Sequence, residues 1–185
     1  MAPDPVEIER ERRRWRALPR ERPARIQRPG PGQESVWDYP RPPRVEGIVR
    51  RLRVELGGRV LAETVRAWRV IETSSPPVYY FPPADVRTEF LEPSPRSSLC
   101  EWKGLARYWS VRIGDRLAAD AVWGYPEPDP GYDAIRDHLA FFPGRMDVCS
   151  VDGEPVLAQP GEYYGGWISA ELVGPFKGEP GSETW

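Results

Sequence analysis

"RRLRVELGGRVLAET", residues 50–64, is the stretch that most directly indicates the fold. Apolar residues alternate with polar ones on both sides of the Gly57-Gly58 pair, and alternate residues of a strand share one face. Two consecutive glycines supply the positive φ angles of a tight type I′ turn. The stretch therefore predicts a β-hairpin, with an inward row formed by Leu52, Val54, Leu56, Val60, Ala62 and Thr64.

Further strand-like pieces follow at roughly ten-residue spacing. They are "RAWRVIET" (66–73), "PPVYYFPPADV" (76–86), "GLARYWSVRI" (104–113), "AADAVWGYPEP" (118–128) and "LAFFP" (139–143). "GYDAIRDHL" (131–139) instead predicts about two turns of helix. This succession of short strands predicts a mainly β protein, a compact β-tent-like or sandwich domain of short antiparallel strands.

The composition divides the chain into three parts. Residues 1–44 predict an Arg/Pro-rich arm and linker, with a helix capped by Asp4 that ends near Ala17, before Pro19. Residues 45–143 form the β domain. Residues 144–185 are rich in glycine, proline and aromatic residues, and we expect this irregular tail to wrap the domain. We expect the tail to bury Tyr163, Trp167, Phe176 and Trp185.

Charge separates the arm from the rest of the chain. The arm carries 11 arginines and 7 acidic residues, whereas the remainder has 15 basic and 21 acidic residues. We expect the arm to dock on its own acidic domain. An arm that binds RNA is the alternative, and we disfavour nucleic acid as a partner because acidic residues are interleaved with the arginines.

Composition also bears on compartment and metal sites. No apolar run approaches the length of a membrane helix, and the first residues are charged without the apolar core of a signal peptide. We therefore expect a cytoplasmic protein with no membrane partner. Two cysteines far apart and a single histidine form no recognisable ligand set, so we expect no metal and no cofactor.

The two lysines stand out among 26 basic residues. Lys103 in "EWKG" and Lys177 in "PFKG" each follow an aromatic residue and precede a glycine. A lysine in this setting can meet a phosphate or carboxylate as a point charge, which makes Lys103 a candidate ligand anchor. The alternative is a structural lysine that pairs with Glu101, Glu72 or Asp85.

Cys100 lies three residues before Lys103. A neighbouring cation raises the thiolate fraction of a cysteine, so Cys100 is a candidate reactive thiol. A catalytic cysteine also needs a base, and the one histidine, His138, is far along the chain. The alternative, a buried structural cysteine, is the one we favour.

Aromatic residues cluster in the middle of the chain, where few large aliphatic residues accompany them. They either form core alone or also line a cleft for a flat or cationic ligand. In the second case Lys103 and Arg66 hold an anionic group, and Glu72 or Asp85 orients the ligand or exchanges a proton. The aromatic lining is then Tyr80, Trp102, Trp109, Trp123 and Tyr125.

Five segments together resemble the family called domain of unknown function 427. They are "GGRVLAETVRAWRVIET", "VYYFPPADV", "LCEWKGLARYWSV", "AVWGYPEP" and "LAFFP", in that order. The resemblance implies a compact β-tent fold, similar to methionine sulfoxide reductase B and to the cereblon ligand-binding domain, which binds ligands in an aromatic cage. Those relatives often carry two CxxC zinc knuckles, which this chain lacks.

The same family carries a nucleotidyltransferase label. Nucleotidyl transfer usually needs paired carboxylates that hold Mg²⁺ beside a triphosphate. The usual Gly-Ser followed by D-x-D does not occur in the chain.

Three functions follow, and whether the protein is an enzyme stays open. The first is a domain that binds a small anionic or flat ligand in an aromatic cleft anchored by Lys103. The second is an interaction module whose arm and tail bind a protein partner or a second copy of the chain. The third is nucleotidyl transfer, which no residue supports.

Overall fold

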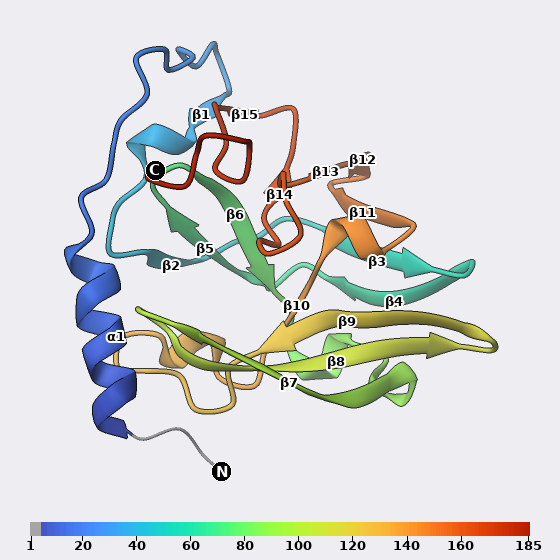
Figure 1. The fold of residues 1–185 in the computed structure, drawn as a ribbon. Coiled ribbons are helices and arrows are strands. Elements are labelled where there is room, and N and C mark those ends of the chain that lie inside the picture. The colour runs from blue at the N-terminus through green and yellow to red at the C-terminus, as the bar shows by residue number, and fades with distance from the viewer. Residues whose placement is uncertain (1–4) are drawn as a thin grey trace.

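The computed structural model describes residues 5–185 (Figure 1). Helix α1 spans Pro5–Ala17, which confirms the predicted helix and its end, while the predicted cap Asp4 lies outside the described residues. Within the described part of the chain, no helix is long and apolar enough to cross a membrane. The remaining regular structure is mainly β, in several small sheets.

The first sheet contains the predicted hairpin. Its strand order is β12-β11-β3-β4, with β3 at Leu52–Leu56, β4 at Arg59–Thr64, β11 at Val148–Val151 and β12 at Glu154–Pro155. Gly57 and Gly58 have φ angles of 58° and 70°, as the turn requires.

The predicted inward row is correct on β3 and wrong in part on β4. The pairing register shifts between Val54 and Glu55, so that Leu61 is an extra, unpaired residue on β4. Because a bulge reverses the alternation locally, Leu61 is buried and Val60 is only half-buried.

The second sheet has the order β10-β9-β8-β7, with β7 at Leu91–Cys100, β8 at Gly104–Ile113, β9 at Arg116–Gly124 and β10 at Leu139–Phe141. Strand β7 was not predicted, because Pro93 and Pro95 interrupt any strand pattern. It is an edge strand whose register shifts between Pro93 and Ser97, and this position accommodates prolines.

The third sheet has the order β2-β5-β6, with β2 at Arg44–Gly47, β5 at Trp68–Glu72 and β6 at Ser75–Tyr80. An antiparallel β-bridge between Phe81 and Leu139 connects the end of β6 to β10 of the second sheet. This connection fixes the third sheet against the second.

The remaining elements are short. Strand β1 (Glu34–Ser35) pairs with β15 (Leu172–Val173), and β13 (Leu157–Ala158) pairs with β14 (Trp167–Ile168). Single 3₁₀ turns occur at Val36–Asp38, Pro83–Asp85, Thr88–Phe90, Asp133–Ile135 and Pro143–Arg145.

The predicted helix at 131–139 is therefore wrong, since only one 3₁₀ turn forms there. Asp137 has a positive φ of 59°, which ends any helix, and Leu139 already donates its N–H to Phe81.

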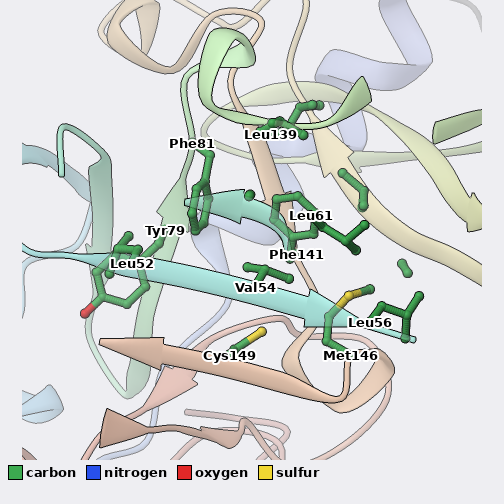
Figure 2. Packing of buried hydrophobic residues seen from close by; sticks show 14 of the residues in the cluster. Leu52, Val54, Leu56, Leu61, Tyr79, Phe81, Leu139, Phe141, Met146 and Cys149 are labelled. Atoms are coloured by element: carbon green, nitrogen blue, oxygen red, sulfur yellow. The ribbon is translucent and has the colours of Figure 1, made fainter. Parts of the chain in front are cut away.

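Two large hydrophobic clusters fill the molecule. The first lies between the first sheet and strands β9 and β10 (Figure 2), and it includes Trp167 of the tail. The second cluster lies between the second and third sheets, and it contains Tyr80, Tyr108, Trp123 and Tyr125.

The predicted burial of tail aromatics is correct for Trp167, which is 1% exposed, and wrong for Tyr163, which is 58% exposed. The other two aromatic residues expected to be buried, Phe176 and Trp185, are half-buried.

The arm contacts the β domain at the turn between β7 and β8, beside α1 in Figure 1. Arg12 and Arg16 both donate to the main-chain oxygen of Glu101, and Arg12 also pairs with Asp129. Farther along, the N–H of Glu21 donates to the main-chain oxygen of Thr184 at 2.8 Å. The arm and the end of the tail therefore lie side by side.

Candidate functional site

A cavity of about 320 Å³ lies between the third sheet and strands β7–β9. Residues of α1 and its linker lie at its border, as do residues of the tail. Its aromatic walls come from β6, β8, β9 and the tail. The members used below are Tyr80, Tyr108, Trp123, Tyr125, Phe142 and Tyr164.

Lys103 enters this cavity from the turn between β7 and β8. The following residue, Gly104, has a φ of 95°, and a Cβ there would stand 3.0 Å from the Asp129 carboxylate. The N–H of Asp129 in turn donates to the main-chain oxygen of Lys103 at 3.0 Å. The turn is thus held by its main chain, which fixes the Cα–Cβ direction from which the lysine side chain starts.

The Lys103 ammonium lies 5.7 Å from the ring centroid of Tyr125. Within residues 5–185 it forms no hydrogen bond and no ion pair. Burial acts to lower the pKa of Lys103, but the acidic groups around it, Cys100 and Tyr125 first, hold the pKa well above its usual value. The side chain is therefore a charged ammonium at neutral pH.

Tyr80 supplies a second polar group, an O–H without an acceptor. Its ring is fully buried, and within the described residues its hydroxyl donates no hydrogen bond, although the Trp123 N–H lies close enough to lower its pKa. Burial raises the pKa of Tyr80 to about 12, against the opposing effects of Lys103 and Trp123. The hydroxyl is neutral at physiological pH and free to donate a hydrogen bond.

Two of the three carboxylates at the cavity wall are engaged by arginines, while the third, Glu183, forms no ion pair within residues 5–185. Glu72, at the end of β5, pairs with Arg41 at 3.0 Å, and Glu101 pairs with Arg20 at 3.5 Å. Two of the cations that line the cavity are thus neutralised. Lys103 has no carboxylate partner among residues 5–185, whereas the Lys177 amine donates to the oxygen of Trp185 at 2.6 Å.

Lys177 is a cavity residue that was not predicted as part of the site. Its side chain reaches the cavity from the tail, with Nζ 5.7 Å from the ring centroid of Tyr164. Burial first, and the neighbouring Arg20 and Arg41 next, lower the pKa of Lys177 to about 8. The shared aromatic-Lys-Gly context with Lys103 is the sequence signal that could have identified it.

Six of the ten predicted site residues line this one cavity. They are Lys103, Glu72, Tyr80, Trp123, Tyr125 and Cys100. Cys100 is half-buried at the end of β7, and Glu72 and Tyr80 end β5 and β6.

The other four predicted residues lie elsewhere. Arg66 and Asp85 form an ion pair with each other at 2.9 Å, and Asp85 also accepts from Thr64. Trp102 packs under the Arg16 guanidinium at 5.2 Å and lines a different hollow beside Pro43 and Tyr132. Trp109 points to the opposite side of the second sheet and lines a hollow with His138. These residues are not brought together with Lys103.

The described residues contain no group of three histidine, cysteine or acidic side chains arranged to hold a metal ion. The second cysteine, Cys149, is buried in the first cluster, where burial raises the pKa of its thiol far above the usual value. His138 is bonded to the main-chain oxygen of Arg136 and lies outside the Lys103 cavity.

Comparison with known families agrees with this arrangement. The family model described as Domain of unknown function (DUF427) matches residues 44–152, more than half of the chain. The chain belongs to this family. No curated protein matches it. The DUF427 segment supplies Lys103 and most of the aromatic wall, whereas Lys177, Tyr164 and the residues from α1 and its linker lie outside the matched segment.

Proposed function

We propose that this DUF427 domain binds a small anionic ligand with a flat, unsaturated ring, and that Lys103 anchors the anionic group. The observation that carries the proposal is a charged ammonium without a hydrogen bond or ion pair in the described chain, at an aromatic cavity. Lysines inside proteins usually meet an acidic partner, because an unpaired charge is costly to bury. A bound anion would supply that partner.

The Tyr80 hydroxyl supports the same function. A buried donor without an acceptor costs roughly 1–3 kcal/mol, so a ligand oxygen at this position would recover that energy. The cavity wall favours a planar ligand, since aromatic rings stack on flat groups and do so at small cost in entropy. Its volume falls within the range of small-molecule sites.

A thermal-shift screen tests the proposal. The panel contains nucleotides, sugar phosphates, amino acids, aromatic carboxylates and flat heterocycles, each measured with wild type and with Lys103→Met. We expect one anionic class to raise the melting temperature of wild type, as a ligand that binds only the folded state must. Loss of the charged contact should weaken binding by about tenfold to a hundredfold.

Two further variants make the result specific. Tyr80→Phe should weaken binding less than Lys103→Met, because it removes one neutral hydrogen bond. Arg66→Met is the matched control, since Arg66 is a cation of the same domain that lies away from the cavity. Equal shifts in wild type and Lys103→Met, for every class, would contradict anchoring by Lys103.

The two alternatives have less support. An interaction module needs an arm and tail that are available to a partner, yet Arg12, Arg16 and Glu21 already bond to the β domain and the tail. Nucleotidyl transfer needs carboxylates that can hold a metal ion, and Glu72 and Glu101 each pair with an arginine.

A further inference from the structure

Cys100 and Lys103 lie at the two ends of one tight turn. Cys100 and Gly104 form the last residue pair of strands β7 and β8, so residues 101–103 make the whole connection. The arginines of α1 hold this turn through the main-chain oxygen of Glu101. Cys100 is half-buried, carries a free thiol and lines the same cavity as Lys103. A nucleophilic sulfur and an ammonium therefore border one cavity from a braced turn.

A third group, the Tyr80 hydroxyl, borders the same part of the cavity. The Tyr80 side chain is completely buried at the cavity wall, and its O–H donates no hydrogen bond within residues 5–185. Cys100 exerts an electrostatic effect on both Lys103 and Tyr80, and Lys103 exerts one on Tyr80. The thiol, the ammonium and the O–H without an acceptor thus surround one point, where a single ligand can meet all three.

These groups suit the addition of a thiol to a carbon–carbon double bond that is conjugated to a carbonyl group. Negative charge then develops on the carbonyl oxygen, and a donor fixed in advance, such as the Tyr80 O–H, stabilises it. An ammonium that binds an anionic group of the same ligand holds the reacting carbon beside the sulfur. Acyl transfer by a cysteine normally uses a histidine, and His138, the one histidine of the chain, lines a different hollow. Addition expels no leaving group that a histidine has to protonate.

We propose that Cys100 is a nucleophile that captures a flat anionic ligand whose carbon–carbon double bond is conjugated to a carbonyl group, while Lys103 holds the anionic group. The sulfur attacks the double-bond carbon farther from the carbonyl, so that an S–C bond forms and the π bond breaks. The thiol proton ends on the carbon next to the carbonyl, and no oxidant, reductant or leaving group takes part. The inference rests on the proposed function, because Lys103 must bind the ligand before Cys100 reacts.

The test uses 3-benzoylacrylate, which is flat and anionic and carries a double bond conjugated to a ketone. The matched neutral probe is 3-benzoylacrylamide, in which an amide replaces the carboxylate. Addition to the full-length protein is followed by mass spectrometry, and peptide mapping assigns the adduct to Cys100 or Cys149. Glutathione, a thiol without a binding site, gives the intrinsic reactivity of each probe. The preference for the acid is the ratio of the acid and amide rates, divided by the same ratio for glutathione.

We expect one adduct, at Cys100, with a preference for the acid of at least about tenfold in wild type. Lys103→Met should reduce this preference to about one, since the carboxylate loses its charged partner. Arg66→Met is the matched control and should retain the preference, because Arg66 lies away from the cavity. Tyr80→Phe should slow the acid and the amide alike, by about tenfold or more, because both probes share the ketone oxygen. Cys100→Ser, checked for an unchanged melting temperature, should abolish the adduct.

Binding is measured separately, from the thermal shift caused by 3-benzoylpropionate, the saturated analogue that cannot add a thiol. A shift that depends on Lys103, together with a preference near one at Cys100, would overturn capture by Cys100 and leave the proposed function intact. A strong preference for the acid that persists in Lys103→Met would overturn anchoring by Lys103, and with it both proposals. Neither a preference nor a thermal shift would likewise overturn both.

Discussion

At the scale of single residues, two glycines decide where the lysines point. Gly104 and Gly178 each follow a lysine, each has a positive φ, and each approaches another segment closely. A residue with a side chain would be strained at either position. The aromatic-Lys-Gly sequence is therefore a local device that places an amine while the main chain turns away from it.

Gly178→Ala is expected to destabilise the protein strongly. A Cβ would stand 1.9 Å from the main-chain oxygen of Pro160, so the tail has to move, and the positive φ adds about 1–3 kcal/mol of strain. Gly181→Ala is the control, since Gly181 also has a positive φ but no atom within 4 Å of a Cβ. Urea unfolding should show a clearly larger loss for Gly178→Ala, and equal losses would rule out the close contact as the cause.

The lowered pKa of Lys177 predicts a dependence of stability on pH. Between about pH 8 and 10.5 the unfolded chain binds a proton at this residue that the folded chain does not. Its contribution to the free energy of unfolding therefore increases as the pH rises through this window, by on the order of 1–3 kcal/mol.

Urea unfolding of wild type and Lys177→Met at pH 7.5 and pH 9.5 measures this effect. Because other groups titrate equally in both proteins, the difference between them isolates Lys177, and wild type should gain relative to the variant at the higher pH. Lys103→Met provides the control, since the raised pKa of Lys103 places its titration above this window. A constant difference for Lys177→Met would show an ordinary lysine.

At the scale of elements, helix α1 depends on the turn between β7 and β8. A helix of this length is marginal alone in water, and its stability comes from packing and side-chain contacts. Arg12 and Arg16 donate four N–H groups to the main-chain oxygen of Glu101, and the Arg16 guanidinium lies over the ring of Trp102. The same turn carries Lys103, so the helix braces one wall of the cavity.

Replacing both Arg12 and Arg16 by alanine is expected to release α1 while the sheets stay folded. Hydrogen bonds from charged donors are worth about 1.5–3 kcal/mol each, so amide exchange over residues 5–17 should accelerate by at least about tenfold. Arg13→Ala with Arg14→Ala is the matched control, because those side chains are 78% and 72% exposed, whereas Arg12 is 12% exposed. Equal acceleration in both double variants would show that the contacts with Glu101 do not hold the helix.

At the scale of the whole molecule, the two hydrophobic clusters have different roles. The first contains aliphatic residues from the first sheet, together with Phe81, Phe141 and Trp167, and it is closed. The second cluster is mainly aromatic, and its rings surround the cavity. The ring centroids of Tyr80 and Trp123 lie 6.4 Å apart, and those of Trp123 and Phe142 lie 4.4 Å apart. Large rings of fixed shape leave space between them that aliphatic side chains would fill.

The two cysteines report on these two regions. Cys100 lines the cavity and should react with iodoacetamide in the folded protein, whereas Cys149 is 4% exposed in the first cluster and should react only when that cluster opens. For a domain of ordinary stability the difference in rate should be at least about a thousandfold. Mass spectrometry follows the alkylation of each cysteine, and the Cys100→Ser variant shows the reaction of Cys149 alone. Similar alkylation rates for the two cysteines would mean that the first cluster opens readily.

The sequence by itself determined most of the strands and the β-hairpin at Gly57-Gly58, because alternation and glycine turns are local properties of the chain. It also marked Lys103, Tyr80, Trp123 and Tyr125 as candidates, through residue type and context.

Only the tertiary structure decided which candidates meet. Alternation shows which residues share a face of a strand, but not what covers that face, and a residue in a turn such as Trp102 has no face at all. Trp109 and Trp123 lie on paired strands and line different cavities. Lys177 joins Lys103 only because the tail folds back over the third sheet, a contact between segments far apart in the chain.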